Sequence, residues 1–281
     1  MNIALKISRF FVYSNLFIAC CTVVMVYQTY DLLLHSIPPL EFVFFTFFAT
    51  ICSYSFHWYL TPTNNVLITG REKWLSHYKK VHLSLFFVGL AGVAVSVFFL
   101  LEHWPWLLLS AAITFFYSAP KIPHPWFRSL RKVALAKTVF LAFVWMYVTT
   151  LLPLEISGQS WQTDFTLFAA SRFFLIYAIC ILFDYRDRDH DRQVGIRSLI
   201  TWLSFKNITR LYITALLLFF VFTVLLLNYG YPLIVVLTLL VPGVLSALLY
   251  RYASRNFPDM LYYFVLDGLM ALSSVITLFI Q

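Results

Sequence analysis

Four aspartates lie close together between residues 184 and 191, in the run DYRDRDHD. Asp184, Asp187 and Asp191 are spaced i, i+3 and i+7, which on a helix places three carboxylates on one face along about 10 Å. Asp189 points away from this face. Hard divalent cations take oxygen ligands, and Mg²⁺ in particular is held by one or two carboxylates together with the phosphates of a substrate. The spacing therefore predicts a catalytic Mg²⁺ site at the three aligned aspartates.

The composition assigns the chain to the membrane. Of its 281 residues, 61% are hydrophobic and 11% are charged, and the mean hydropathy is +0.82. A spanning helix needs about 20 mostly apolar residues, and the polar stretches between apolar segments are too short to bury a core of their own. We therefore predict an all-α membrane protein, a nine-helix transmembrane bundle that forms a single domain over residues 1–281. The predicted spans are residues 10–30, 40–60, 81–101, 104–120 (the shortest), 132–152, 164–184, 208–228, 231–250 and 260–280.

The basic residues alternate from loop to loop. Eighteen of the 20 Lys and Arg residues lie before span one or in the loops after spans two, four, six and eight, and the loops of the other parity hold none. Because Lys and Arg in short loops stay on the cytoplasmic side, we predict a cytoplasmic N-terminus, an outer C-terminus and a cytoplasmic acidic cluster. The net charge of +8 is mostly this topology signal, and no nucleic-acid motif accompanies it. We expect a multi-pass protein of the cytoplasmic (inner) membrane.

Two basic residues lie inside predicted spans. A cation at bilayer depth costs at least about 2.5–3.5 kcal/mol, so it normally faces the bundle interior or a wet cavity. Lys137, about a turn and a half inside span five, either extends back to the interface or serves the site. Arg172, near the middle of span six, is too deep to reach the interface and is predicted to face the interior. Asp267, an acidic residue well inside span nine, is its candidate partner.

The acidic run resembles a known motif. Residues 184–199 read D-x-x-D-x-x-x-D-x-x-x-G-x-x-S-L, which is similar to the second aspartate motif of the UbiA superfamily of intramembrane prenyltransferases. In that superfamily the motif lies at the cytoplasmic end of the sixth of nine helices, as predicted here. The segment Tyr117-Ser118-Ala119-Pro120 also resembles the superfamily's Y-S-x-P segment before a basic loop.

The resemblance implies a helical bundle whose central cavity opens sideways to lipid. An isoprenyl diphosphate would lie with its tail in the bilayer and its diphosphate bridged by Mg²⁺ to the aspartates. Ionisation would give a carbocation that alkylates an aromatic or other lipid-soluble acceptor. On this interpretation the substrate-binding candidates are Tyr54, His57, Arg71, Lys73, Tyr117, Lys137, Arg172, Arg192 and Arg197.

One family motif is missing. The superfamily carries a first motif, N-D-x-x-D-x-x-x-D, at the end of helix two, whereas this chain has Tyr54, His57 and Thr61 at the spaced positions. No Asp or Glu lies between Glu41 and Glu72. Either one aspartate triad, helped by His57 and basic residues, still binds a metal diphosphate, or the chemistry is lost or altered.

Three functions therefore stay open. The leading one is an enzyme that transfers an isoprenyl group to a lipid-soluble acceptor. The others are an intramembrane terpene cyclase or diphosphate-cleaving relative, and a non-catalytic binding protein on a degenerate prenyltransferase scaffold. The acidic run could also be a solvated loop in which Arg186, Arg188 and Arg192 neutralise their neighbours.

Overall fold

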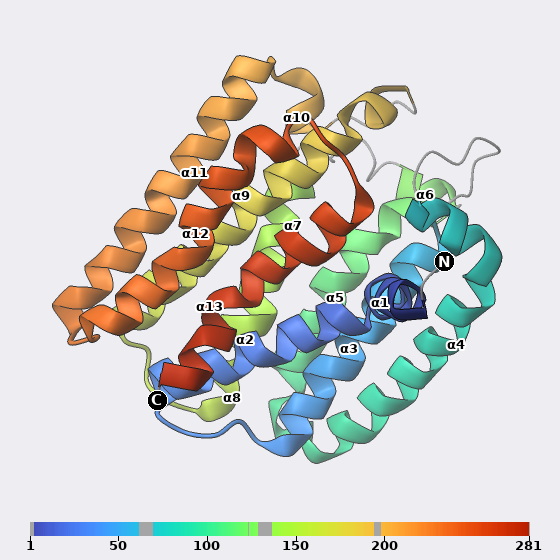
Figure 1. The fold of residues 1–281 in the computed structure, drawn as a ribbon. Helices are drawn as coiled ribbons and strands as arrows, with labels where there is room; N and C mark the ends of the chain where they lie inside the picture. Colours follow the sequence, from blue (N-terminus) through green and yellow to red (C-terminus); the bar gives the residue numbers. More distant parts are fainter. Residues whose placement is uncertain (1–2, 62–69, 123, 129–136, 194–197, 281) are drawn as a thin grey trace.

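The computed structural model describes residues 3–61, 70–122, 124–128, 137–193 and 198–280, and within these ranges it is built from helices without a strand (Figure 1). Eight helical segments of this described part are long and apolar enough to cross a membrane. They are α2 (Leu16–Leu34), α3 (Leu40–Tyr59), α4 (Gly70–Phe99), α7 with η4 and α8 (Lys137–Ser157), α9 (Thr163–Gln193), α11 with η5 (Phe205–Tyr229), α12 (Leu233–Ala253), and η6 with α13 (Leu261–Ile280).

The fourth and the last of these spans are continuous runs of shorter elements. α7 (Lys137–Met146) passes through the π-helical turn η4 (Tyr147–Leu151) into α8 (Leu152–Ser157). The last span begins as the π-helical segment η6 (Leu261–Leu266) and continues as α13 (Asp267–Ile280). Between α4 and α7 lie η1 (Leu101–His103), α5 (Trp104–Ser118), η2 (Ala119–Lys121) and α6 (Pro125–Arg128). α5 has 15 residues and is shorter than the eight spans.

The prediction for the first span was wrong in its start. A separate helix, α1 (Ile3–Tyr13), precedes the span, and α2 begins only at Leu16. The chain turns at Asn15, whose φ of 69° is left-handed and ends a helix. In Figure 1, α1 is seen nearly end-on while α2 runs across the view. Because Ile3 and Ile7 are exposed on α1 beside Lys6 and Arg9, this helix has the composition of one that lies at a membrane interface.

The spans form a closed ring. Contacts lead from α2 to α3, α5, α7, α9, α11, α12 and α13, and from α13 back to α2. α4 lies outside this ring against α3, as Figure 1 shows at its right-hand edge. The two helices approach so closely that a Cβ at Gly89 would lie 2.7 Å from the backbone nitrogen of Cys52. Glycine is therefore what permits this packing.

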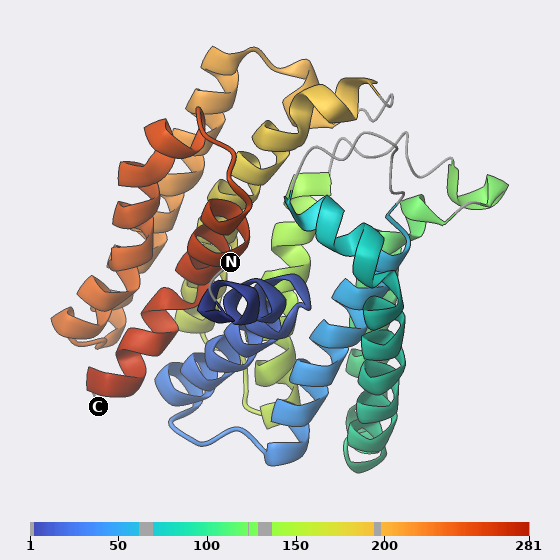
Figure 2. The same cartoon turned by 45° about the vertical axis from the view of Figure 1, so that its right-hand side comes forward.

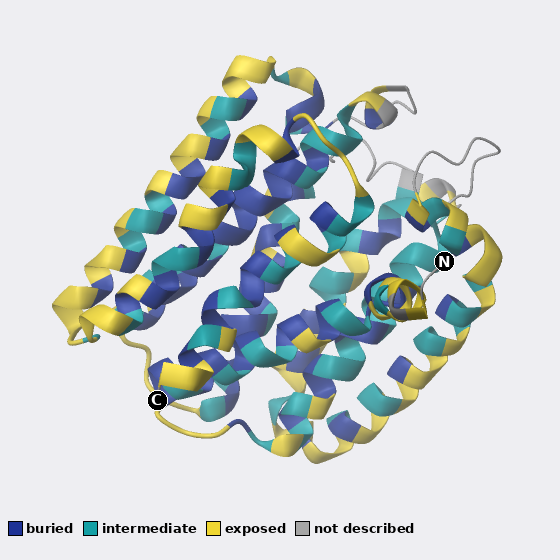
Figure 3. Cartoon of the chain, in the orientation of Figure 1, coloured by how far each residue is buried: buried dark blue, intermediate teal, exposed yellow. Residues whose placement is uncertain are grey.

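Burial follows the ring. Large apolar side chains are exposed on the outward faces of α4, α11 and α12, whereas the residues of α9 and of the facing helices are buried (Figure 3). α9 is the most buried of the eight spans. This pattern is typical of a membrane protein, because its lipid-facing side chains are as apolar as its core. The short helices α6 and α10 (Leu199–Trp202) lie at the same end of the bundle (Figure 2), which is also the end of α9 that carries the aspartates.

Candidate functional site

The aspartates lie on the last three turns of α9, a single helix that continues to Gln193. Asp184 and Asp191 are buried and share one cation: the Lys137 ammonium lies 3.6 Å from Asp184 Oδ1 and 3.7 Å from Asp191 Oδ2. The Thr138 hydroxyl donates a hydrogen bond to Asp184. Asp189 is exposed, as its helical position predicts. Two of the three predicted aspartates therefore converge on a position that already favours a positive charge.

The structure also decides between the two interpretations of Lys137. The residues that precede Lys137 in the predicted span, 132–136, lie outside the described residues, and α7 is described from Lys137 onward. The side chain keeps 30% of its surface exposed while it bridges Asp184 and Asp191. It therefore belongs to the site and is held there by two carboxylates from the neighbouring helix.

Asp187 faces a different group of partners. Arg186 Nε lies 2.7 Å from Asp187 Oδ1, and Arg186 Nη2 donates to the Tyr263 hydroxyl at 2.8 Å. The Arg71 guanidinium also lies over the Tyr263 ring, 4.1 Å from its centroid, and over the Trp58 ring, 4.0 Å from its centroid. These contacts place two arginines, from α4 and α9, around one tyrosine of η6.

Each of these two arginines has one buried N–H group that no acceptor in the described protein satisfies. Among the described residues, Arg71 Nε and Arg186 Nη1 are buried and have no hydrogen-bond partner in the protein. A buried donor without an acceptor costs about 1–3 kcal/mol, and more when it is charged. Two such donors on neighbouring guanidinium groups are therefore typical of a site that receives an anion.

The positions of the missing first motif surround a lysine. The Lys121 ammonium donates to His57 Nε2 at 2.7 Å and to Thr61 Oγ1 at 2.6 Å. The other ring nitrogen of His57 lies 3.3 Å from Ser118 Oγ, and the Tyr117 ring stacks on the imidazole. Burial, and then repulsion by Lys137, lower the pKa of Lys121 to about 7. An ammonium group therefore occupies the place where a metal site would need carboxylates.

The aspartates of α9 and the positions around His57 can be compared with the ligands that Mg²⁺ requires. In the described part of the chain no three His, Cys, Asp or Glu side chains form a ready-made cage. Mg²⁺ does not need one, because one or two carboxylates and the phosphates of a substrate suffice. Asp184 and Asp191 already hold a cation between them and fit this requirement once Lys137 moves aside. The positions around His57 and Thr61 do not fit, because they offer no anionic oxygen.

The remaining predicted residues divide into two groups. Tyr54 accepts a hydrogen bond from Trp145 Nε1 at 3.0 Å and so lies deeper, among aromatic side chains. Arg192 donates to the Thr201 carbonyl, which ties α9 to α10 and does not bring it to the aspartates. Lys73 is exposed on the first turns of α4. Arg197 lies outside the described residues.

Sequence reasoning missed three groups at this site. Lys121 had been counted only as a loop cation, although it directly follows the Tyr117–Pro120 segment. The sequence assigns Arg186 only a neutralising role in the loop, and it assigns Tyr263, with Tyr262, only a C-terminal resemblance to the superfamily. The adjacency of Lys121 to that segment was the one available signal, because the partners of Lys121 lie about 60 residues away in the chain.

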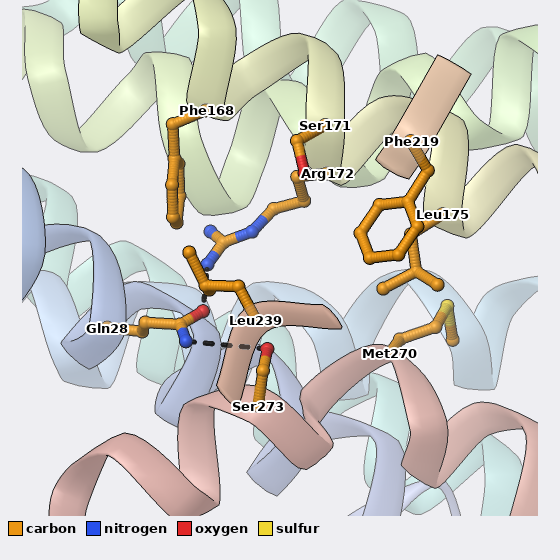
Figure 4. Close-up of a pocket in the computed structure, with 9 residues that line it drawn as sticks. All are labelled: Gln28, Phe168, Ser171, Arg172, Leu175, Phe219, Leu239, Met270 and Ser273. Atoms are coloured by element: carbon orange, nitrogen blue, oxygen red, sulfur yellow. Dashed lines mark hydrogen bonds between the residues drawn. The ribbon is translucent and has the colours of Figure 1, made fainter. Parts of the chain in front are cut away.

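Arg172 faces the bundle interior, as predicted. Its guanidinium donates to five oxygens: Met25 O, Thr29 Oγ1 and Gln28 Oε1 of α2, and Thr149 O and Thr150 Oγ1 of η4. Figure 4 shows it directed at Gln28, which in turn hydrogen-bonds Ser273 of α13. The predicted partner, Asp267, is absent from these bonds, so that assignment was wrong. Neutral oxygens solvate this arginine because two elements, α2 and η4, bring them to it together.

A ring of helices long and apolar enough to span a membrane is the architecture of an integral, multi-pass membrane protein. We call the cluster of charged and polar side chains at one end of the ring the functional pole; it consists of Arg71, Lys121, Lys137, Asp184, Arg186, Asp187, Asp191 and Tyr263. The model of the UbiA prenyltransferase family matches residues 76–273, more than half of the chain. The chain therefore belongs to the UbiA prenyltransferase family. Curated proteins yielded no match to it.

Proposed function

We propose that this protein transfers an isoprenyl group from an isoprenyl diphosphate to an aromatic or other lipid-soluble acceptor. The observation that carries the proposal is the pair of buried, unpartnered donors on Arg71 and Arg186, two arginines that share Tyr263 and of which Arg186 is paired with Asp187 of α9. Donors of this kind suit an oxyanion with several acceptor oxygens, and a diphosphate is such a group. Membership of a prenyltransferase family supports the same substrate class.

In this proposal the basic residues bind the diphosphate oxygens and the aspartates bind the metal. Arg71, Arg186 and Lys121 would donate to the diphosphate oxygens. Asp184 and Asp191 would hold Mg²⁺, joined by Asp187 once the Arg186 guanidinium turns from that carboxylate to the diphosphate. When bound, Mg²⁺ neutralises charge on the leaving diphosphate and so assists its departure. Lys137 would release Asp184 and Asp191 as the metal arrives and would then be free to donate to a phosphate. The gathered cations favour the transition state because negative charge develops on the leaving group there.

Bond breaking and bond making follow from this arrangement. The bond between C1 of the isoprenyl chain and the diphosphate oxygen breaks, and the electron pair leaves with the diphosphate. The acceptor then supplies an electron pair to C1, forms the new bond and loses a proton. Tyr117, Tyr54 and Trp145 place electron-rich rings on the membrane side of the aspartates, where a carbocation would form.

We further propose how the bundle sits in its membrane. η1 and α5 run without a break from Leu101 to Ser118, which is long enough to serve as the ninth span and leaves Lys121 beyond its end. With nine spans the N-terminus is cytoplasmic, the C-terminus lies outside, and the aspartate end of α9 faces the cytoplasm, as the loop charges predict. The cytoplasmic membrane is the proposed location, and residues 1–281 are taken as one domain.

The experiment is a binding measurement on the purified full-length protein in nanodiscs. A non-hydrolysable farnesyl thiodiphosphate should bind in a buffer that contains Mg²⁺. When EDTA removes the metal, its affinity should fall at least about tenfold, which is roughly 1.4 kcal/mol of binding free energy. Asp187→Asn should weaken binding by a similar factor, whereas Asp189→Asn, on the exposed side of the same helix, should leave it unchanged. Equal effects of the two substitutions would show that the run is a solvated loop and would refute the proposal.

One observation favours a second candidate, a non-catalytic binding protein on this scaffold. Lys121 and Lys137 already occupy both cation positions at the pole. If they substitute for metals without activating the leaving group, the diphosphate would bind tightly and stay intact. Single-turnover assays that follow diphosphate release with and without added acceptor separate the cases. Release without acceptor indicates a cyclase or diphosphate-cleaving enzyme, and no release on any acceptor indicates the binding protein.

A further inference from the structure

The side chain of Asn15, in the turn between α1 and α2, contacts two further helices beside the functional pole. It is buried, and its Oδ1 accepts a hydrogen bond of 2.7 Å from Arg71 Nη2 of α4. Its amide nitrogen lies 3.4 Å from Ser55 Oγ of α3 and 3.5 Å from His82 Nδ1 of α4. Because these two groups can accept the hydrogens of the nitrogen, they orient the amide so that its oxygen faces Arg71.

α4 bends between the two of its residues that contact Asn15. Arg71 and His82 lie eleven residues apart, which is about 16 Å along a straight helix, yet both reach the same amide. The dihedral angles of Tyr78 are not helical (φ −115°, ψ 27°), and Figure 2 shows the first turns of α4 inclined to the rest of the helix. The bend therefore helps to bring the start of α4, with Arg71, to the turn that holds Asn15.

The backbone of Arg71 is held as well as its guanidinium. The Arg71 N–H donates to Asp259 Oδ2 at 2.7 Å, and the Tyr13 hydroxyl donates to the same oxygen at 3.2 Å. A Cβ at Gly70 would lie 3.0 Å from this oxygen, so a residue without a side chain stands where the carboxylate approaches the start of α4. A carboxylate is also favoured at a helix N-terminus. Asp259 and Asn15 therefore fix the two ends of Arg71.

The hydrogen bond to Asn15 distinguishes among the donors of the Arg71 guanidinium. The Trp58 and Tyr263 rings attract its positive charge but do not select one of its N–H groups. A hydrogen bond is directional and does select one. Among the described residues, Asn15 is the acceptor that this guanidinium reaches, and it takes Nη2, whereas Nε has no acceptor. Asn15 therefore determines which donor of Arg71 remains for an anion.

We propose that Asn15 is a positioning residue for the diphosphate, which holds Nη2 of Arg71 so that the Nε donor stays available to the anion. The inference rests on the proposed function and adds to it a residue that does not itself touch the substrate. Asn suits the position for two reasons. Its backbone is left-handed, with a φ of 69°, which Asn adopts more readily than most residues, and its side chain supplies a neutral acceptor.

The test measures the binding of inorganic diphosphate and of farnesyl thiodiphosphate to the full-length protein in nanodiscs with Mg²⁺. Asn15→Gly keeps the left-handed turn and removes the amide. We expect both ligands to bind at least about tenfold more weakly, roughly 1.4 kcal/mol, and by the same factor, because Arg71 acts on the head group that they share. Ser14→Ala removes a buried hydroxyl from the same turn without touching Arg71. It is the matched control and should bind both ligands as the wild-type protein does, and an equal loss in this control would overturn the inference.

A double-mutant cycle with Arg71→Met separates positioning from a general effect on the fold. If Asn15 acts through Arg71, the double variant should bind no more weakly than Arg71→Met alone. Additive losses would show that Asn15 acts on the fold and would overturn the inference. Normal affinity of Asn15→Gly, beside a loss for Arg71→Met, would overturn it and leave the proposed function intact. Absence of diphosphate binding by the wild-type protein would overturn both.

A second variant serves where Asn15→Gly does not fold. Ser55→Ala together with His82→Phe removes both partners of the Asn15 amide nitrogen and lets the amide turn away from Arg71. The same two criteria apply to this pair. A loss for both ligands that disappears in the Arg71→Met background supports the inference, and no loss or an additive loss overturns it.

Discussion

The two lysines of the functional pole differ in the charge of their partners. Lys137 lies between Asp184 and Asp191, whereas Lys121 is fixed by His57 and Thr61, which carry no negative charge. Carboxylates stabilise an ammonium ion, but a buried imidazole and a hydroxyl compensate only partly for lost hydration. The ammonium form of Lys137 is therefore already stabilised, whereas the ammonium form of Lys121 would be stabilised further by a bound anion.

The first residue-scale prediction concerns the protonation of Lys121. Its lowered pKa, about 7, means that the ammonium form is lost as pH rises through about 7 in the ligand-free and metal-free protein. Between that pH and the unfolded value near 10.5 the unfolded chain binds the extra proton, so this group makes stability rise with pH over that interval. An anion should raise the midpoint, because it favours the charged form. The groups that act on Lys121 from the neighbouring elements are His57, Arg71, Lys137, Asp187 and Asp191.

The measurement is an NMR titration of ¹³C-methylated lysines. One resonance should titrate near pH 7, should be missing from Lys121→Met, and should move to higher pH when inorganic diphosphate is added. A resonance assigned to Lys121 that remains charged at pH 9 without ligand would contradict this prediction.

The second residue-scale prediction concerns Arg172 and its five acceptors. Arg172→Lys keeps the charge but loses the planar fork that reaches α2 and η4 together. We expect the free energy of unfolding to fall by about 3 kcal/mol, since at least one or two charged hydrogen bonds are lost. Thermal unfolding in detergent measures the effect. Arg251→Lys, at an exposed position of α12, is the control and should change little, and equal melting of the two variants would contradict the role of the fork.

At the scale of elements, the contact between α3 and α4 depends on one small residue. Because a Cβ at Gly89 would lie 2.7 Å from Cys52 N and 2.9 Å from Cys52 Cα, the clash would be with backbone that cannot rotate away. Overpacking of this kind costs about 1–3 kcal/mol. α4 also brings Arg71 to Trp58, which lies on α3, so displacement of α4 would move a residue of the functional pole.

Gly89→Ala should therefore lower the melting temperature and weaken binding of the farnesyl thiodiphosphate together. Ala91→Val adds volume to an exposed position of the same helix and serves as the control, which should leave both unchanged. A variant that melts earlier but binds normally would show that the helix contact is independent of the Arg71 position. Differential scanning fluorimetry and the nanodisc binding assay give the two readouts.

At the scale of the whole molecule, the ring of helices and the loop charges agree on which end is polar. The pole, α6 and α10 lie at one end (Figure 2), and among the described basic residues Arg71, Lys121 and Arg186 lie at the same end. The opposite end carries Gly158 and Gln159, both exposed, between α8 and α9. Lysine and arginine resist translocation, so their end should remain in the cytoplasm.

Cysteine labelling checks this orientation. In a background with the four native cysteines replaced, Gln159→Cys should react with an impermeant maleimide added outside intact cells, and Asp189→Cys should react only after the membrane is opened. Both positions are exposed on the structure, so failure to label cannot come from burial. External labelling of position 189 would contradict the topology and the proposed access of a cytoplasmic diphosphate.

Patterns local in the chain were readable from the sequence, because they depend on neighbours along one helix. Apolar length predicted most spans, the i, i+3, i+7 spacing placed Asp184, Asp187 and Asp191 on one helix, and insertion cost predicted that Arg172 faces inward. Family membership was also predicted, from the motif that begins at Asp184, and is confirmed.

The tertiary structure decided which distant side chains meet. Lys121 reaches His57 and Thr61, Arg71 reaches Tyr263, and Arg172 reaches Gln28 and η4 only because the ring brings their helices together. The start of the first span also depended on the tertiary structure. The chain turns at Asn15, although the sequence on both sides of that residue is apolar. Hydropathy and periodicity indicate whether a residue faces lipid or the protein core. The identity of its partner depends on which helices pack side by side and in which register.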